Sequence, residues 1–185
     1  MRERQPIVEY LAMHIPNLEV VWDTEGHAFH TFLAACVAAG DEPCVRLEDD
    51  VVLTKNFETK IQAVVDQVPA NIVQFFSRSK YDGVKGSRWK GGGTFSMNQC
   101  YYLPAGMSTR LHRYYHDGWT RRVEDPMGYD TMMAEMLKGE RYWVQVPSLV
   151  NHVVGKSAID YRRAHTRQST TFVDPELEGF PGELA

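Results

Sequence analysis

The sequence has few cysteines and no long apolar run, and each absence excludes a class of protein. No stretch of its 185 residues approaches the ~18 consecutive apolar residues of a transmembrane helix. The opening Met-Arg-Glu-Arg-Gln-Pro lacks the apolar stretch of a signal peptide. Cys36, Cys44 and Cys100 form no Cys-x-x-Cys pair and no disulfide framework. We therefore expect a reduced, cytoplasmic setting without membrane insertion.

Excess positive charge is also missing. The formal net charge is −4, which argues against a general polyanion binder. Hydrophobic residues make up 43% of the chain, a proportion typical of one soluble globular domain. No internal repeat is present. We expect a single domain over residues 1–173, followed by an acidic, loosely held tail over residues 174–185. The oligomeric state stays open.

Helical and strand patterns alternate in the first part of the chain, which predicts an α/β fold with a mainly parallel sheet. The predicted elements are a helix over 6–14, a strand over 18–22, a helix over 27–39, a strand over 44–48, a helix over 57–68 and a strand over 71–76.

The second part of the chain opens with a segment of different character. Residues 77–94 are rich in glycine and basic residues and show no periodicity, which predicts a long loop acting as a lid. The predicted elements after it are a strand over 95–103, a helix that begins near Pro104, a helix over 131–138 with Asp130 as its N-cap, and strands over 142–145 and 149–153.

The most informative stretch is Arg46-Leu-Glu-Asp-Asp-Val-Val-Leu53, in which three carboxylates follow a buried strand. Such a cluster is destabilised by repulsion and desolvation unless a cation sits beside it. Mg²⁺ or Mn²⁺ would suit these oxygen ligands and would hold a nucleotide diphosphate. Because side chains alternate on a strand, Glu48 and Asp50 should share one face, with Asp49 on the other. The alternative is a solvated strand end or a helix-capping cluster.

Two residues far along the chain could complete an active site. Asp130 could act as a general base on an acceptor hydroxyl, although its N-cap position also explains it, and Glu124 and Asp125 compete for the role. His152, near the end of a strand, could complete the metal shell together with Asp50. A histidine at such a position is more often a structural hydrogen-bonding residue.

Donor-binding candidates come from two loops. Asp23 follows the predicted strand over 18–22 and could bond a ribose or base, or simply start a turn. Lys80 and Arg88 in the 77–94 segment could neutralise a departing diphosphate if that segment closes over the donor. Simple flexibility of the segment is the alternative.

Taken in order, these residues resemble a known family. The segment Arg46 to Phe57 is similar to the acidic-motif segment of the lipooligosaccharide and collagen galactosyltransferases, glycosyltransferase family 25. The stretches Phe95–Leu111, Gly128-Tyr-Asp130-Thr-Met-Met and Pro147-Ser-Leu-Val-Asn-His152 to Ile159 resemble later parts of the family. The matches run from about residue 27 to residue 160.

The resemblance implies a GT-A (Rossmann-like) fold that transfers a sugar, with inversion, from a nucleotide sugar such as a UDP-sugar. It implies Mn²⁺ or Mg²⁺ held by Asp50 with Glu48 or Asp49, and it puts Asp130 at the late acidic position. The usual first strand, which lines the nucleotide, has no counterpart here. The acceptor could be a glycan, a protein or modified DNA.

Two other functions stay open on the sequence. A metal-dependent phosphodiesterase or nuclease also uses clustered carboxylates, and Asp130 and His152 could supply its second set. A nucleotide-sugar-binding module without catalysis is the other alternative, and the missing first strand favours it.

Overall fold

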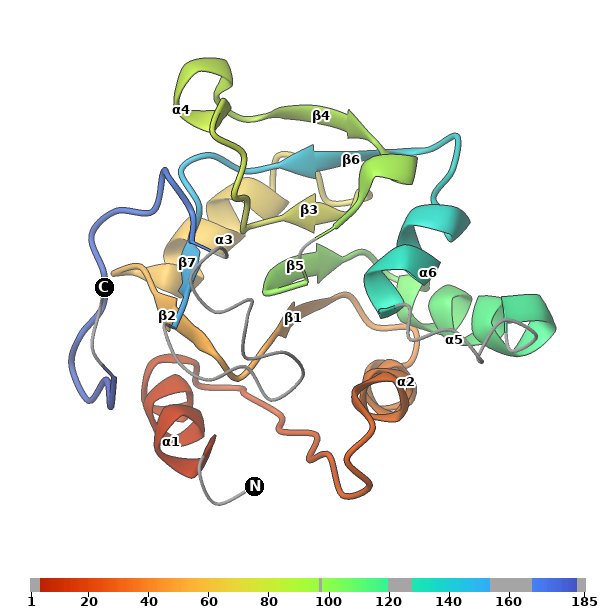
Figure 1. Ribbon diagram of the computed structural model, residues 1–185, viewed down its shortest axis with the longest axis horizontal. Coiled ribbons are helices and arrows are strands. Elements are labelled where there is room, and N and C mark those ends of the chain that lie inside the picture. The colour runs from red at the N-terminus through yellow and green to blue at the C-terminus, as the bar shows by residue number, and fades with distance from the viewer. Residues whose placement is uncertain (1–3, 97, 120–127, 154–167, 183–185) are drawn as a thin grey trace.

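The structure, a computed structural model, describes residues 4–96, 98–119, 128–153 and 168–182 of the chain. It confirms the expected α/β class, with helices around a five-stranded sheet and a second, two-stranded sheet beside it (Figure 1). The helices are α1 (Gln5–His14), α2 (Ala28–Ala39), α3 (Phe57–Val65), α4 (Asp82–Lys85), α5 (Met107–Gly118) and α6 (Tyr129–Met136). The strands are β1 (Cys44–Leu47), β2 (Val51–Leu53), β3 (Val73–Gln74), β4 (Arg88–Gly91), β5 (Cys100–Leu103), β6 (Arg141–Val144) and β7 (Val150–His152).

The five-stranded sheet is mixed, so the prediction of a mainly parallel sheet is wrong. Its order is β1-β5-β3-β6-β4, and only β3 and β6 pair in parallel. Because β5 is antiparallel to both β1 and β3, the strands β1, β3 and β6 still point the same way, as strand–helix alternation predicts. Two strands of opposite direction join them: β5 separates β1 from β3, and β4 closes the far edge. The periodicity of apolar residues in a sequence indicates that a segment is a strand, but it does not indicate which strand pairs with it.

The predicted strand over residues 18–22 is also wrong. This segment is an irregular connection between α1 and α2, and its Val20 and Trp22 side chains are 37% and 39% exposed. Among the described residues no strand pairs with the outer side of β1, which is therefore an edge of the sheet. An alternating apolar pattern becomes a strand only where a partner strand satisfies its backbone groups.

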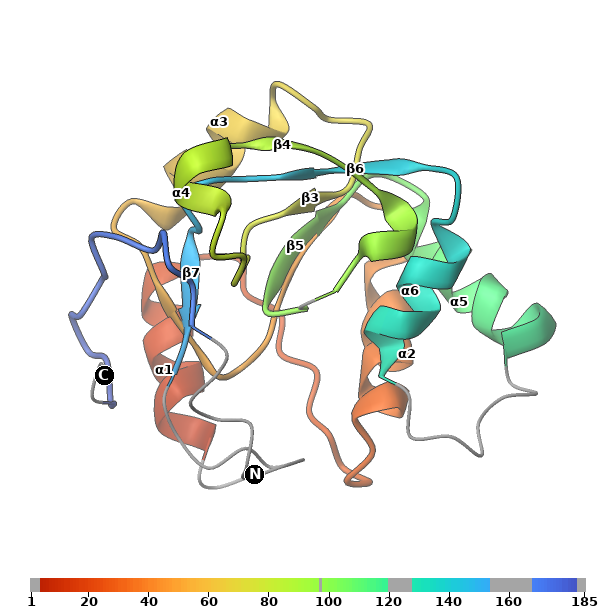
Figure 2. The same ribbon diagram turned by 45° about the horizontal axis from the view of Figure 1, so that its top comes forward.

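Two hydrophobic clusters fill the two faces of the sheet. On one face, α2, α5 and α6 pack against Tyr101 and Tyr142 of the strands. On the other face, α1, α3 and the two-stranded sheet pack against Val73 and Tyr102. Figure 2 shows α2, α5 and α6 grouped together, away from α1 and α3. The sheet thus separates the chain into two packed halves, and β1 and β2 carry the chain from one to the other.

Residues 77–94 form ordered elements, so the long loop predicted there is wrong. The segment holds α4, β4 and the short 3₁₀ helix η2 (Gly92–Thr94). β4 pairs with β6, and Trp89 meets Trp143 edge-to-face with ring centroids 5.4 Å apart. The glycines hide the strand pattern in the sequence, but Gly92 has a packing reason: a Cβ there would lie 2.1 Å from the carbonyl oxygen of Leu137.

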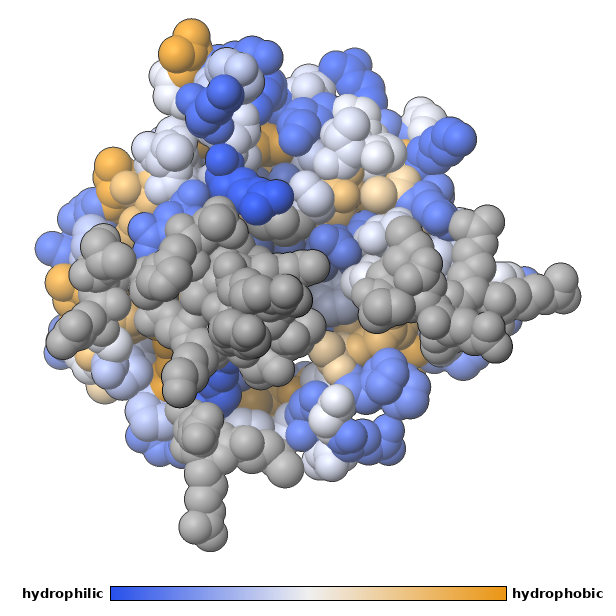
Figure 3. All heavy atoms as spheres, in the orientation of Figure 1, coloured by the Kyte–Doolittle hydropathy of each residue, from blue (hydrophilic) through white to orange (hydrophobic). Residues whose placement is uncertain are grey.

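The surface carries no large apolar face in the view of Figure 3, where hydrophobic residues of the described chain form small, separate patches among hydrophilic ones. Within the described ranges, no helix combines the length and the apolar character needed to cross a membrane. Cys36, Cys44 and Cys100 are free thiols.

The segment after Asp174 differs from the loosely held tail that its composition predicts. The Glu176 amide donates to the Leu53 carbonyl at 2.8 Å, and Phe180 packs edge-to-face on Tyr10 at 5.2 Å. The buried Tyr10 hydroxyl joins both regions, because it donates to the Glu176 carbonyl at 2.9 Å and accepts from the Leu53 amide at 3.0 Å. Burial raises the pKa of Tyr10 to about 12, so the hydroxyl keeps its proton. The backbone hydrogen bond of Glu176 and the packing of Phe180 therefore hold this segment against the fold despite its acidic composition.

Tyr10→Phe should therefore loosen the C-terminal segment. It removes both hydrogen bonds and leaves the Leu53 amide without this acceptor, which should cost about 1–3 kcal/mol of unfolding free energy. Urea unfolding and limited proteolysis beyond residue 170 would measure the effect. The matched control is Tyr81→Phe, whose side chain is 54% exposed and which should change neither. Equal stability of the two variants would contradict the role given to Tyr10.

Candidate functional site

The acidic motif lies where the chain leaves one sheet for the other. β1 ends at Leu47, residues 48–50 bend, and β2 begins at Val51. The Glu48 amide still donates to the Gln99 carbonyl at 3.0 Å, next to β5, whereas the Asp50 carbonyl accepts from Val153 at 2.7 Å, next to β7. Residues 48–50 therefore connect the five-stranded sheet to the two-stranded sheet. The two hydrophobic clusters hold both sheets in place.

The bend overturns the predicted alternation of these side chains. Asp49 and Asp50 both face the guanidinium of Arg4, with oxygens 3.4 Å and 3.9 Å from its Nη1. Glu48 acts instead on Tyr101 across the other side of β1: burial raises the pKa of that hydroxyl, and the Glu48 charge raises it further. The strand has already ended, so the two-residue period no longer applies.

Asp50 and His152, 102 positions apart in the sequence, lie side by side. Antiparallel pairing of β2 with β7 sets Val51 opposite His152, and the His152 Nε2 atom is 3.1 Å from Asp50 Oδ2. The imidazole is 4% exposed and the Asp50 side chain 24%. The Nδ1 atom of His152 is buried and has no hydrogen-bond partner within the described ranges. The two residues that the sequence suggests as metal ligands are thus neighbours.

Burial is the main influence on the pKa of Asp49 in this cluster. Burial raises the pKa of Asp49, the nearby Asp50 raises it further, and Arg4 opposes both without cancelling them. A cluster of this kind attracts an additional cation.

The pair Asp50–His152 fits a divalent cation in part. Two ligands that each lie about 2.1 Å from one metal ion are themselves ~3 Å apart, close to the 3.1 Å between these atoms. The described residues bring no group of three or more His, Cys, Asp or Glu side chains together as a cage. Mg²⁺ is commonly held by only one or two carboxylates, with water and substrate phosphates in its other positions.

Asp23 starts a turn in the structure. Its Oδ1 accepts hydrogen bonds from the amides of Glu25 at 3.2 Å and His27 at 3.0 Å, immediately before α2. The bond from the His27 amide is the largest cause of the lowered pKa of Asp23. These are the contacts of a turn-forming aspartate, which is the alternative that the sequence leaves open for Asp23.

Arg88 and Lys80, the predicted donor contacts, are engaged elsewhere. Arg88 Nη2 lies 2.5 Å from Oδ1 of Asp82, a fully buried carboxylate, and its Nη1 donates to the Gly86 carbonyl at 2.8 Å. β4, which carries Arg88, is four strands from β1 across the sheet, roughly 19 Å at ~4.8 Å per strand. The Lys80 ammonium lies 5.1 Å from the centre of the Tyr81 ring. The structure does not bring Arg88 to the acidic motif.

Asp130 is inside the first turn of α6, so the prediction that it is the N-cap is wrong. Gly128 is the N-cap, and Asp130 Oδ1 accepts from the Thr131 amide at 2.9 Å. An acidic residue in a first helical turn interacts favourably with the helix dipole. Glu124 and Asp125, the competing bases, lie outside the described residues.

A chain of ring contacts places the start of α6 on the same side of β1 as Glu48. The Tyr129 ring stacks on Phe32 with centroids 4.4 Å apart, and the Arg46 guanidinium lies 4.5 Å from the centre of that same ring. Arg46 and Glu48 both act on the pKa of Tyr101, which Arg46 lowers and Glu48 raises. The start of α6 therefore packs on the α2 side of the sheet, whereas Asp50 pairs with His152 of β7 and lies near Arg4, next to α1.

Sequence reasoning did not predict the contacts of two arginines. Arg4 begins α1 and pairs with the acidic motif. Arg46 is half-buried, and it donates to the Phe32 carbonyl and the Cys36 Sγ atom, each at 2.9 Å. The signal for Arg46 was an arginine within an apolar strand pattern. No local signal indicates Arg4, because 44 residues separate it from the carboxylates.

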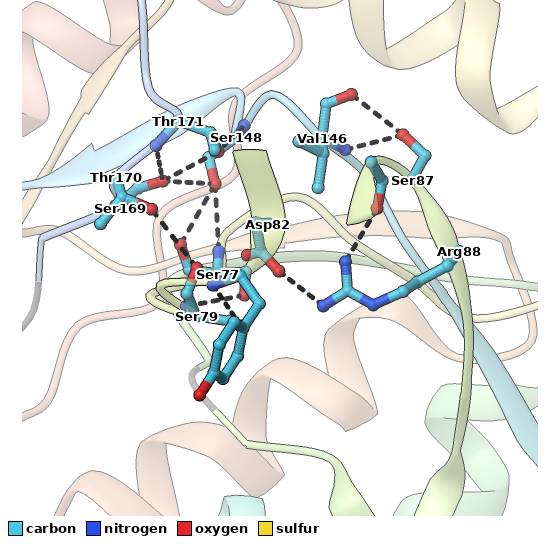
Figure 4. A network of polar contacts seen from close by, with 12 residues as sticks. Ser77, Ser79, Asp82, Ser87, Arg88, Val146, Ser148, Ser169, Thr170 and Thr171 are labelled. Atoms are coloured by element: carbon cyan, nitrogen blue, oxygen red, sulfur yellow. Dashed lines mark hydrogen bonds and ion pairs between the residues drawn. The ribbon is translucent and has the colours of Figure 1, made fainter. Parts of the chain in front are cut away.

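A buried network of hydroxyl groups supports the strand that carries His152 (Figure 4). The Ser77 amide donates to Ser148 Oγ at 3.1 Å, and Ser169 Oγ donates to the same atom at 2.8 Å. The Ser169 amide donates to Asn151 Oδ1 at 2.9 Å, one residue before His152. The network thus joins the segment before α4, the start of β7 and the chain after residue 168.

Two surface hollows outlined by the described residues lie away from the acidic motif. One of about 580 Å³ runs along α5 and is lined by Arg110, Arg113 and Tyr114. Another of about 270 Å³ lies beside the start of α3. Neither is lined by the residues proposed as metal ligands, so the site rests on its chemistry and not on a cavity.

Comparison of the sequence with protein-family models finds no match, and comparison with curated proteins finds no significant one.

The Asp82–Arg88 pair gives a prediction for the role of Arg88. Arg88→Met leaves the buried Asp82 carboxylate without its partner, and it should cost ~3 kcal/mol, the low end for a buried pair because Arg88 is 22% exposed. Lys85→Met, an exposed neighbour in α4, is the matched control and should have little effect. Chemical denaturation would measure both variants.

The pH dependence of that loss follows from the pKa of Asp82. Burial raises it, but hydrogen bonds from Ser77 and Arg88 outweigh burial and hold it below the ordinary value of 3.8. A lowered folded-state pKa stabilises the fold above the unfolded-state value, and this stabilisation is lost as pH falls through the folded-state value. The gap between wild type and Arg88→Met should thus be widest near neutral pH and shrink below pH 3.8. A pH-independent gap would contradict the ion pair as its cause.

Proposed function

We propose that this protein is a metal-dependent glycosyltransferase of GT-A type. It moves a sugar from a nucleotide-sugar donor, a UDP-sugar in the first instance, to an acceptor hydroxyl. The observation that carries the proposal is the 3.1 Å separation of Asp50 Oδ2 and His152 Nε2 beside a strand-end cluster of carboxylates. The resemblance of the acidic segment to family 25 supports the same reaction.

The proposal gives the acidic cluster one task, to hold the donor. Asp50 and His152 would hold Mn²⁺ or Mg²⁺, with Asp49 beside them. The bound ion would bridge the donor diphosphate and offset the charge that develops on the leaving nucleotide. Burial of His152 fixes its ring, and the Ser148 network supports the strand that carries it. A rigid site of this kind needs little rearrangement when the donor arrives.

Asp130 is proposed as the base that takes the proton of the acceptor hydroxyl. It lies in the first turn of α6, next to Tyr129, whose ring stacks on Phe32 of α2. In an inverting displacement the base takes the proton of an acceptor hydroxyl within hydrogen-bond reach, and that hydroxyl attacks the anomeric carbon from the side away from the leaving group. Asp23, Lys80 and Arg88 have no part in this proposal, because turn and ion-pair contacts account for Asp23 and Arg88.

The first experiment is calorimetric binding of UDP, GDP and their common sugar conjugates, with and without Mn²⁺. We expect one nucleotide to bind only with Mn²⁺ present. Asp50→Ala and His152→Ala should each weaken that binding by at least ~100-fold, since loss of even an outer-shell partner costs 10–100-fold.

The matched control is Asp66→Asn, at the C-cap of α3, which should bind like wild type. Circular dichroism would verify that each variant is folded. Mn²⁺-dependent binding retained by folded Asp50→Ala would refute the metal assignment. Donor binding without transfer to any acceptor would instead favour a binding module, and cleavage of nucleic acid without a donor would favour a nuclease.

A further inference from the structure

Two histidines on α5 lie outside the proposed donor site. His112 and His116 are four residues apart on the helix, so their side chains share one face. Their Nε2 atoms are 3.2 Å apart, with ring centroids at 4.5 Å and an interplanar angle of 56°. Both rings are accessible: His116 is exposed and His112 half-buried.

The geometry of this pair suits a shared metal ion. Two imidazole nitrogens that each lie ~2.0–2.1 Å from a tetrahedral ion are ~3.3 Å apart, close to the 3.2 Å seen here. Histidines at i and i+4 on a helix have the spacing of helical zinc ligands. Imidazole nitrogen prefers Zn²⁺, Ni²⁺ and Cu²⁺, whereas Mg²⁺ and Mn²⁺ prefer oxygen.

The helix that carries the pair is fixed by packing. Ser108, Leu111 and Tyr115 form its buried side, and the Tyr115 ring meets the His116 ring edge-on with centroids 5.1 Å apart. Ligands on a packed helix lose little conformational freedom on binding. The two nitrogens are therefore close to their bound positions before an ion arrives.

Other described histidines are engaged differently. His14 contacts the Glu178 carbonyl at 2.8 Å, and His30 pairs with Glu25 at 3.0 Å. The Nδ1 of His27 accepts from the His30 amide at 3.4 Å. Within the described part of the chain, no carboxylate pairs with His112 or His116. Their ring nitrogens converge only on each other.

We propose that His112 and His116 form a two-imidazole site for a borderline transition-metal ion, Zn²⁺, Ni²⁺ or Cu²⁺. The remaining coordination positions face solvent and take water or a donor group of a bound molecule. The site is independent of the oxygen-rich cluster at Asp50 and differs from it in metal preference.

The test is a calorimetric titration of the full chain with Ni²⁺ and with Zn²⁺ in excess Mg²⁺, which occupies oxygen-ligand sites. We expect one equivalent to bind at this site. His112→Ala and His116→Ala should each weaken binding by about 10²-fold, because the second ligand then no longer acts at high effective concentration. His30→Ala is the control and should leave that affinity unchanged.

Nitrogen-15 spectra of the imidazoles give a second readout on wild-type protein. Coordination should shift the Nε2 resonances of both His112 and His116 on adding one equivalent of Zn²⁺. Wild-type affinity in either single variant, or a shift confined to one ring, would overturn the proposal. Because both side chains are solvent-accessible, His112→Gln and His116→Gln provide folded substitutes if an alanine variant is unstable.

Discussion

The pairing of β2 with β7 is the contact on which the candidate site depends. β1 and β2 are separated by only three residues, yet they belong to different sheets, so the chain must bend at Glu48, Asp49 and Asp50. A shift of one residue in the β2–β7 register would turn His152 to the opposite face. Burial of Val51, Val52 and Leu53 in the second hydrophobic cluster prevents that shift, since these side chains are fully excluded from solvent.

Much of the fold follows from the sequence where one segment decides its own structure. The helices α1 and α2 and the strand β1 begin and end near the predicted residues, whereas β5 ends at the predicted Leu103 but begins at Cys100, five residues later than predicted. The sequence does not specify which strands pair with one another. The segment over 18–22 has a strand pattern but no partner, and β4 has a partner but a glycine-rich pattern. Sheet order and direction depend on contacts between distant residues, which periodicity does not encode.

The candidate site also combines residues that the sequence suggests with contacts that only the fold creates. Asp50 and His152 could be proposed together because metal chemistry needs both ligand types near a strand end, and the fold brings them within 3.1 Å. Asp23 and Arg88 were chosen for their charge, and a turn and a buried carboxylate account for their contacts. Arg4 was missed because only the packing of α1 against the two-stranded sheet brings it to Asp49.

Helix α1 therefore links two parts of the molecule that look unrelated. Arg4, the N-cap residue of α1, places its positive charge beside the acidic motif. Further along the helix, Tyr10 holds the C-terminal segment against β2. Detaching that segment would remove part of what seats α1, and so would free Arg4 from the carboxylates. Glu176 and Phe180 on one side and Asp49 on the other thus contact the same short helix region, through Tyr10 and Arg4.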